Sequence, residues 1–555
     1  MFKLTPLCLA AVLLMQLPAS VVHAAPVAAK VDQALAAQID AAIAPLYKAN
    51  EPGVTVIVTK DGKPVLRKAY GMADVANKVA MQPDMTLRLG SITKQFTATA
   101  ILMLAEEGKL NLSDPISKFL PDYPMQGKTI TIEHLLTHTS GIVSYTNKPD
   151  YEGGMTRDLT PAAMIDTFKN DPLEFEPGTR MHYNNSGYFL LGAIIEKISG
   201  QTYAKFLETR IFTPLGMRHT AFEGSELVPP VRAVGHTLGE NGFNVAPALS
   251  MTQPYAAGSL VSTVDDLAIW DAAITAGKLL KPESWKKAHT SYILADGKPT
   301  NYGYGWGMSS LRGTPMIAHG GGINGFSTFA LRLPEKKVFV AVLGNNDRAK
   351  LSPDYVAQKV AGIAAGNPFP DFKAITADPA ALQAASGQYQ QDAQTNRVVR
   401  VVDGKLTMQR PGRPPFAIIP FAKDSYFVPD TFSTFTFERD AKGEVTQLTL
   451  HDNGIDVVSK RTGPVPPEVK AVKVAQEKLD AYVGRFELQP GFVLTFKRDG
   501  EKFIGQATGQ PAFNLVAESD AVFYVKEVDA RVRFEGNDKV VLLQNGQELP
   551  GKRLK

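Results

Sequence analysis

Hydrophobic positions follow two different periods near the start of the chain. Between about residues 26 and 50, apolar side chains recur at helical spacing, at Leu35, Ile39, Ile43 and Leu46. This spacing predicts a helix. Residues 54–59 and 65–70 are instead rich in β-branched and alternating apolar residues, and Asp61-Gly62 between them is typical of a two-residue hairpin turn. We therefore expect a helix followed by a β-hairpin.

The helical period returns at Ser91, and a second strand pair follows much later. Apolar residues after Ser91 share one face of a predicted helix, and helices and loops continue to about residue 310. Strands are predicted at 326–333 and 338–343 around the turn 334–336. Strands at both ends of this region indicate one antiparallel sheet assembled from N- and C-terminal pieces, in a domain of the α/β (α+β) class over residues 25–365.

The pattern changes after about residue 363, where a Pro-containing linker at 365–370 precedes short strands and turns. Two units repeat: Leu382, Gly387, Tyr389, Phe427-Val428 and Asn453-Gly454 match Leu479, Gly484, Phe486, Tyr524-Val525 and Asn545-Gly546. The first unit has about eight short apolar runs. We therefore expect two small antiparallel β-barrels of lipocalin-like type, at 375–462 and 470–555, on either side of a Pro-rich joint. Neither has an ionisable cluster, so we expect them to be structural or to shape access to the first domain.

Residues 1–24 have the order of an export signal. Lys3 precedes an apolar run at 7–17 that is too short to span a bilayer, and Val22-His23-Ala24 predicts cleavage after Ala24. The alternative is a buried N-terminal helix. No later segment is apolar and long enough to cross a membrane. We therefore expect an exported protein, in the periplasm or, alternatively, secreted to the medium.

Charge and cysteine content exclude several classes of function. The 555-residue chain has 59 basic and 55 acidic side chains, a balance that argues against nucleic-acid partners or an anionic membrane surface. Its single cysteine, Cys8, lies in the predicted signal, which leaves no thiol for disulfides, nucleophilic catalysis or metal binding in the mature chain. No cofactor is expected, and the expected partner is a small-molecule or short-peptide substrate. A homo-oligomer is compatible with the sequence, which does not fix the oligomeric state.

The candidate chemistry begins with Ser91 and Lys94. A hydroxyl and an amine three residues apart at a helix start share one face, as a serine nucleophile and a neutral lysine base require. The pattern is weak alone, since Ser91 is also a plausible helix cap and Ser284-x-x-Lys287 repeats it. Two further patches strengthen it, residues 177–188 with Tyr183-x-Asn185 and residues 319–325 with His319-Gly320-Gly321-Gly322.

With these motifs the chain resembles the serine hydrolases related to class C β-lactamases and penicillin-recognising enzymes. That family is marked by Ser-x-x-Lys, Tyr-x-Asn and Lys-x-Gly or His-x-Gly, and residues 135–141 and 257–263 fit it too. The resemblance covers about residues 35–350. A second Tyr-x-Asn, Tyr145-x-Asn147, lacks the flanking Pro-Gly and Gly-Tyr and follows Ser91 too closely. The two barrels make D-aminopeptidase-type members the most similar, and in these a barrel loop reaches the active site.

The resemblance implies a role for each matching residue. Ser91 would attack a carbonyl and form an acyl-enzyme, Lys94 would take its proton, and Tyr183 would share that work and protonate the leaving group. The substrate would contact Asn185, His319 and Gly321, with the oxyanion between the backbone N–H groups of Ser91 and Gly322. A buried core tyrosine and a buried structural histidine are the alternatives for Tyr183 and His319.

His319 changes the expected substrate. β-Lactamases usually have lysine there, whereas histidine is mostly neutral near pH 7 and offers a carboxylate no permanent cation. We therefore expect a peptidase or amidase acting on short or D-residue-containing peptides. The alternatives are a carboxylesterase, a β-lactamase or D-Ala-D-Ala carboxypeptidase, and a penicillin-binding sensor that acylates without turnover.

Two other patterns are rejected. His134 and His138 have metal-ligand spacing, but Leu135 stands where a zinc protease needs glutamate, so packing is the better interpretation and no metal is expected. The glycines at 320, 322 and 325 fit a dinucleotide fingerprint, but a predicted strand, not a helix, follows them.

Overall fold

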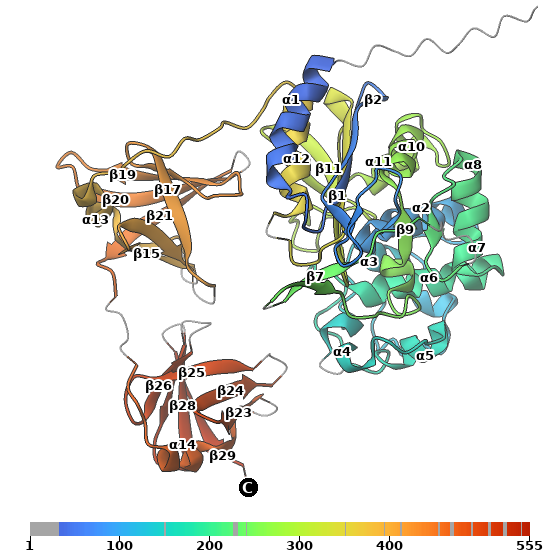
Figure 1. The fold of residues 1–555 in the computed structure, drawn as a ribbon. Coiled ribbons are helices and arrows are strands. Elements are labelled where there is room, and N and C mark those ends of the chain that lie inside the picture. Colours follow the sequence, from blue (N-terminus) through green and yellow to red (C-terminus); the bar gives the residue numbers. More distant parts are fainter. Residues whose placement is uncertain are drawn as a thin grey trace, which may run out of the picture.

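The computed structural model describes residues 33–554 except 149–150, 226–230, 240, 350, 393–394, 411–412, 453–454, 467–470, 490–491, 509–511, 526–529 and 545–546. The predicted signal at 1–24 and the repeated Asn-Gly pairs at 453–454 and 545–546 lie outside these residues. Figure 1 shows an α/β domain followed by two β-barrels. Within the described residues, no helix combines the length and apolar character needed to cross a bilayer.

The first domain is built on one antiparallel sheet in the order β10-β11-β12-β13-β1-β2. Its strands are β1 (Val54–Lys60), β2 (Lys63–Tyr70), β10 (Gly307–Leu311), β11 (Thr314–Ile323), β12 (Phe326–Leu333) and β13 (Val338–Gly344). β1 pairs with β13 along its whole length, so the expected sheet from both ends of the domain is confirmed. Asp61 and Gly62 both have positive φ, as the two-residue turn requires. The β10–β11 hairpin was not predicted.

Helices cover both faces of this sheet, and β1 is therefore buried on both sides. Val56 and Val58 join the core beneath α1 (Gln33–Ile43) and α12 (Pro353–Ala364), whereas Ile57 points into the other core. On that second face α10 (Val264–Thr275) packs against β1 and β13. The helix predicted to reach residue 50 is wrong at its end, because only η1 (Ala44–Leu46) continues it. Pro45 lacks the N–H that an α-helix needs and disfavours helical backbone before it.

Next to α10 lies a helical region centred on α2 (Thr93–Glu106), which is buried from Thr93 to Leu104. α2 contacts α6 (Asn185–Ser199), α7 (Tyr203–Leu207) and α9 (Tyr255–Gly258). Elsewhere the α/β domain contains α3 (Ile132–Leu136), α4 (Tyr151–Gly154), α5 (Pro161–Asp166), α8 (Thr213–Leu215), α11 (Pro282–Ala288) and the short strands β3 (Met72–Asp74), β4 (Val79–Ala80), β5 (Leu87–Arg88), β6 (Ala221–Phe222), β7 (His236–Gly239), β8 (Gly242–Val245) and β9 (Leu260–Ser262). Because α2 is buried all round, a polar group at its start is buried as well.

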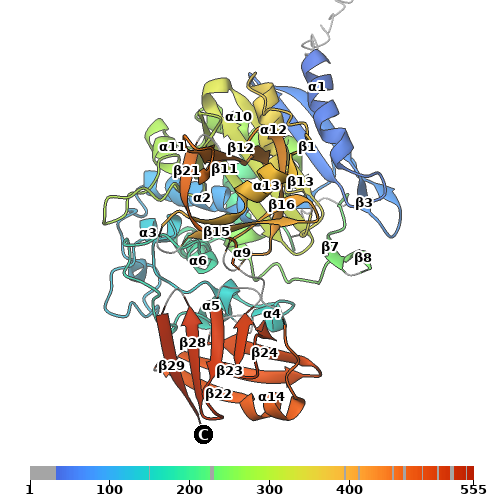
Figure 2. The same cartoon turned by 90° about the vertical axis from the view of Figure 1, so that its left-hand side faces the viewer.

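Both repeat units fold as closed eight-stranded antiparallel barrels. The first barrel contains β14 (Gly387–Gln390), β15 (Asn396–Val402), β16 (Lys405–Gln409), β17 (Phe416–Ala422), β18 (Ser425–Phe427), β19 (Thr434–Arg439), β20 (Val445–Asp452) and β21 (Ile455–Gly463). The second contains β22 (Gly484–Gln489), β23 (Phe492–Asp499), β24 (Lys502–Ala507), β25 (Phe513–Ala517), β26 (Val522–Val525), β27 (Ala530–Phe534), β28 (Lys539–Gln544) and β29 (Gln547–Arg553). Figure 2 shows the second with α14 (Gln476–Tyr482) at one end.

The repeated residues explain why the barrels are alike. Leu382 lies in α13 (Pro379–Ala385) and Leu479 in α14, and both helices send this leucine into a barrel core. Tyr389 and Phe486 are fully buried two residues into β14 and β22. Each unit is therefore a short helix packed against a barrel, with an aromatic core residue on its first strand.

The first barrel contacts the α/β domain through aromatic rings. Phe432 stacks on Phe369 of the linker at 3.5 Å between ring centroids and on Tyr355 of α12 at 4.7 Å. Phe372 packs against Phe421 and Phe427 of the barrel. These described contacts lie on the α12 side of the sheet, opposite the helical region that contains α2.

Candidate active site

Ser91 lies in η2 (Gly90–Ile92), the short turn that leads into α2. Its hydroxyl does not cap the helix, because Ile92 is the N-cap residue and no side chain caps it. The capping alternative for Ser91 is therefore wrong. Gly90 has φ +54° and lies directly against β11, so that a Cβ there would come within 3.0 Å of the Gly322 nitrogen. The sequence thus brings the hydroxyl of residue 91 to the sheet edge.

Lys94 is wholly buried one helical turn after Ser91. Its Nζ lies 3.1 Å from Ser91 Oγ, 2.8 Å from Asn185 Oδ1 and 2.9 Å from the Ala257 carbonyl. In the described part of the chain no carboxylate forms an ion pair with it. Burial therefore holds the pKa of the Lys94 amine well below its usual value of 10.5, which favours the neutral form.

Tyr183 is placed by a loop that runs along residues 138–141. The N–H groups of Glu174, Gly178 and His182 donate to the carbonyls of Gly141, Thr139 and His138 in turn. α6 then begins at Asn185, with Asn184 as its N-cap. The ring of Tyr183 lies 4.8 Å from Lys94 Nζ. Its enclosed hydroxyl has no well-formed hydrogen bond within the described residues. Burial raises the pKa of this phenol, and the nearby Ser91 hydroxyl partly lowers it.

Tyr145, the tyrosine of the second Tyr-x-Asn pattern, is held elsewhere. Tyr145 is buried beside Tyr151 and Phe189, and its hydroxyl donates to the Gln253 carbonyl at 2.8 Å. Its neighbours support the site indirectly, because the backbone N–H of Asn185 donates to Ser144 Oγ and Asn185 Nδ2 donates to Thr146 Oγ1. The Tyr145 segment thus orients Asn185 but does not bring its own phenol to Ser91.

The edge of β11 completes the site. β10 pairs only with residues 314–318 of β11, so that residues 319–323 extend past the end of β10. A Cβ at Gly321 would lie 1.9 Å from the Leu89 carbonyl oxygen, whereas a Cβ at Gly322 would meet nothing within 4 Å. Thr328 fixes the same contact by donating to the Leu89 carbonyl at 2.8 Å. Gly321 is thus required by packing, and Gly322 faces open space.

This difference gives a paired prediction. Gly321→Ala is expected to destabilise the protein by about 1–3 kcal/mol, the usual cost of an overpacked site, because backbone has to move away from the new methyl group. Gly322→Ala is expected to change the free energy of unfolding by less than about 0.5 kcal/mol. Urea denaturation of both variants measures the difference. Equal losses of stability would contradict the close packing of β11 against Leu89.

His319 is buried, with only 8% of its surface exposed, and both ring nitrogens are occupied. Nδ1–H donates to the Gly320 carbonyl at 2.6 Å, and Nε2 accepts from the Tyr302 hydroxyl at 2.8 Å. Burial, followed by the nearby Lys94 amine, lowers the pKa of His319 to about 4. The imidazole is therefore neutral at pH 7 and supplies no cation for a substrate carboxylate.

Several neighbours of these residues were not assigned to the site from sequence. They are Thr146, Tyr302, His138 and Ala257. The Ala257 carbonyl accepts a hydrogen bond from Lys94. Ala257 and His138 belong to runs that carried the family resemblance, which was the one available signal. Carbonyl acceptors and ring neighbours depend on long-range packing, which local patterns do not encode.

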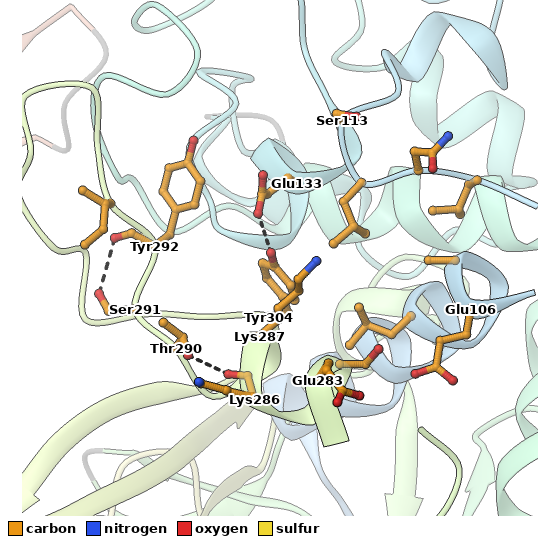
Figure 3. Close-up of a pocket in the computed structure, with 17 residues that line it drawn as sticks. Glu106, Ser113, Glu133, Glu283, Lys286, Lys287, Thr290, Ser291, Tyr292 and Tyr304 are labelled. Carbon is orange, nitrogen blue, oxygen red and sulfur yellow. Dashed lines mark hydrogen bonds between the residues drawn. The ribbon is translucent and has the colours of Figure 1, made fainter. Parts of the chain in front are cut away.

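A separate cavity of about 830 Å³ is shown in Figure 3. Its lining includes Glu133, which accepts a hydrogen bond from Tyr304, but none of the seven predicted site residues. Ser284 and Lys287 of the second Ser-x-x-Lys also line it, and Lys287 is exposed. Across the described residues no group of three or more His, Cys, Asp or Glu side chains is placed to hold a metal ion.

Comparison with known proteins identifies the family. The family model described as Beta-lactamase matches residues 30–364, more than half of the chain. The chain belongs to the beta-lactamase family. Protein flp of Staphylococcus aureus (strain NCTC 8325 / PS 47) is 33% identical over 327 residues, which is 57% of this chain and 63% of that protein. The chain thus spans less than two thirds of the length of this relative. Penicillin-binding protein 4* of Bacillus subtilis (strain 168) is 26% identical over 74% of this chain and 94% of its own length.

Solved structures in the family extend the similarity. The octameric penicillin-binding protein homologue from Pyrococcus abyssi has a TM-score of 0.54 and 24% identity, with 94% of this chain and 98% of that chain covered, and shows the fold alone. D-amino acid amidase from Ochrobactrum anthropi SV3, complexed with D-phenylalanine, has a TM-score of 0.50 and 25% identity over 61% of this chain and 97% of its own. The beta-lactamase family of serine hydrolases thus includes penicillin-binding proteins and D-amino acid amidases, and the expected fold class is confirmed.

Proposed function

We propose that this protein is a serine hydrolase that forms an acyl-enzyme on Ser91 and cleaves amide bonds in short or D-residue-containing peptides. The observation that carries the proposal is the position of the buried Lys94 amine, 3.1 Å from Ser91 Oγ. Among the residues that the structure describes, no carboxylate forms an ion pair with this amine. An amine in that setting can act as a general base at neutral pH.

The hydrogen bonds of Lys94 favour proton transfer from Ser91. A neutral amine has two N–H groups and one lone pair. The two N–H groups donate hydrogen bonds to Asn185 Oδ1 and to the Ala257 carbonyl oxygen. The lone pair then remains for the third neighbour, so the Ser91 hydroxyl donates to it. As Ser91 attacks a carbonyl carbon, its proton passes to Lys94 and the amine becomes an ammonium held by three acceptors.

Tyr183 and the β11 edge supply the remaining steps. The phenol stays protonated because its pKa is raised by burial, and it lies beside both Ser91 and Lys94. It relays the proton to the departing amine, so that the C–N bond breaks and the acyl group stays on Ser91. The backbone N–H groups of Ser91 and Gly322 stabilise the oxyanion, and Gly321 keeps the edge against Leu89. Water then attacks the ester carbonyl and releases Ser91.

The environment of His319 and the comparisons both support the proposed substrate class. A neutral His319 does not favour substrates that depend on a cation for their carboxylate, which weakens the β-lactamase and carboxypeptidase alternatives. The similarity to a D-amino acid amidase supports an amide substrate with a D-residue. Asn185 and the exposed part of residues 319–323 are proposed to bind the substrate backbone. A carboxylesterase is the second candidate, because acyl-enzymes form readily from esters and this mechanism does not distinguish the leaving group.

A panel of three chromogenic substrates tests the proposal: a D-alanine p-nitroanilide, a short p-nitrophenyl ester and a chromogenic cephalosporin. We expect turnover of the anilide. Turnover of the ester alone would favour the esterase, and turnover of the cephalosporin alone the β-lactamase. A stoichiometric burst without further product would favour a penicillin-binding sensor.

The two tyrosines give a second prediction. Tyr183→Phe is expected to lower kcat by roughly 10²–10⁴-fold, the usual contribution of a general acid–base group, because the phenol beside Ser91 is lost. Tyr145→Phe removes only the bond to the Gln253 carbonyl, so its effect on kcat should stay within about tenfold. Steady-state kinetics with the anilide compares them. The opposite ranking would show that the wrong tyrosine was assigned.

We also propose that the protein is exported and assembles into a homo-oligomer. The order of charge, apolar run and alanine-rich site in residues 1–24 supports export to the periplasm, with the medium as the alternative. The octameric homologue supports a homo-oligomer.

A further inference from the structure

We propose that His138 is a positioning residue that fixes the phenol of Tyr183 beside Ser91 by holding the backbone on both sides of residue 183. The inference rests on the proposed function of Tyr183. It adds a residue for which the sequence had offered only metal spacing or packing. Three kinds of observation support it: hydrogen bonds, ring contacts and backbone conformation.

Two hydrogen bonds from neighbouring residues end on His138. The N–H of His182 donates to the His138 carbonyl at 2.9 Å, and the N–H of Asn184 donates to His138 Nδ1 at 3.0 Å. Residue 183 lies between these two anchors. Its φ and ψ are therefore limited from both ends, one through main chain and one through the imidazole.

The imidazole also contacts the tyrosine ring itself. The ring centroids of His138 and Tyr183 are 4.2 Å apart, and Tyr302 lies 4.7 Å from His138 on another side. The phenol ring of Tyr183 is thus supported by the same side chain that binds its backbone. Ring packing and a backbone hydrogen bond together leave the phenol oxygen little freedom to leave Ser91.

The protonation state of His138 suits this task. Nδ1 accepts from Asn184, so the proton of the neutral ring is on Nε2. Burial, then the nearby Lys94 and His319, hold the pKa of His138 well below its usual value. A protonated ring would lose its acceptor at Nδ1, and the environment prevents this.

Backbone conformation argues against a role in packing alone. His138 has φ +60°, in the left-handed region that favours glycine or asparagine. Such a conformation costs free energy and persists where the surroundings require it. Apolar packing would be satisfied by many side chains with ordinary backbone, whereas an acceptor aimed back at Asn184 requires this particular geometry.

Two variants that both tolerate positive φ separate the acceptor from the ring. His138→Gly removes ring and acceptor, while His138→Asn keeps an amide oxygen near the position of Nδ1. Each is made in the wild-type and in the Tyr183→Phe protein, and kcat and KM are measured with the anilide or, failing that, the ester. Circular dichroism establishes folding.

We expect His138→Gly to lower kcat by roughly 10–100-fold with little change in KM, as for a misplaced catalytic group. His138→Asn should recover much of this loss. In the Tyr183→Phe background both variants should change kcat by less than about twofold, since the phenol they position is absent. The same fold-loss in both backgrounds, or no loss in the wild-type background, would overturn the inference.

A crystal structure of the His138→Gly protein tests the inference independently of activity. If the glycine variant does not fold, the His138→Asn protein takes its place. Displacement or disorder of the Tyr183 ring supports it, and an unmoved ring overturns it. If wild-type protein hydrolyses none of the three substrates, the proposed function fails, while this structural result still decides whether His138 positions Tyr183.

Discussion

Replacing Ser91 by alanine is expected to reduce turnover of the anilide and the ester by on the order of 10⁴-fold or more, the loss that follows removal of a serine nucleophile. The Ser91 hydroxyl makes a hydrogen bond with Lys94 Nζ and caps no helix, so its loss should leave the fold intact. Steady-state kinetics and thermal unfolding of the variant measure the two effects.

The chain contains its own control for this experiment. Ser284 begins the second Ser-x-x-Lys pattern but lies in α11, where it lines the cavity of Figure 3. Ser284→Ala should therefore retain activity close to that of the wild type. Undiminished turnover by the Ser91→Ala protein would rule out Ser91 as the nucleophile, and with it the proposed mechanism.

Substitution of Lys94 by methionine is expected to lower kcat by roughly 10²–10⁴-fold, because the proposed base for the Ser91 proton is lost. Methionine is similar in length and apolar, so it fits the buried space. The same change should alter how stability depends on pH, which gives a readout independent of catalysis.

The direction of that pH effect follows from the depressed pKa of Lys94. Below pH 10.5 the unfolded chain binds a proton on this amine, whereas the folded protein does not until the pH falls to its lower folded-state pKa. Between these values the lysine makes folding less favourable by about 1.4 kcal/mol for each unit that the pH falls. The stability of Lys94→Met relative to wild type should therefore rise as the pH is lowered from 10 toward 7.

Urea denaturation at pH 7, 8, 9 and 10 measures this trend. Lys287→Met is the matched control, since Lys287 is the exposed lysine of the second Ser-x-x-Lys. Its stability relative to wild type should be the same at each pH. A Lys94→Met difference that is also independent of pH would mean that Lys94 is charged in the folded protein and is not poised as a base.

Local patterns were enough to predict the parts of the fold that form between near neighbours. The β-branched runs around Asp61-Gly62 and around the turn at 334–336 gave both hairpins, and the repeat of Leu382 and Tyr389 by Leu479 and Phe486 gave two similar barrels. The end of the first helix was not predicted, because the helical spacing of apolar residues continues to Leu46. Pro45 has no backbone N–H to donate, so the α-helix ends before it.

Parts of the site depend on contacts that no local pattern contains. The sequence placed Ser91 and Lys94 one turn apart, but only packing shows that the Ala257 carbonyl accepts from Lys94. The flanking residues favoured Tyr183 over Tyr145, whereas the hydrogen bond from the Tyr145 hydroxyl to the Gln253 carbonyl could be seen only in the structure. Sequence analysis assigned His138 to packing, because spacing along the chain does not reveal an acceptor aimed at Asn184.

The aromatic stack at the linker has a practical consequence for anyone who shortens the chain. Phe432 covers Tyr355 and Phe369, so a truncation after residue 370 would leave these two rings facing water on the surface of the α/β domain. Such a fragment would be prone to self-association through that newly bared patch. Polar replacements at both rings, made together with the truncation, are the sensible starting point for a soluble version of the α/β domain alone.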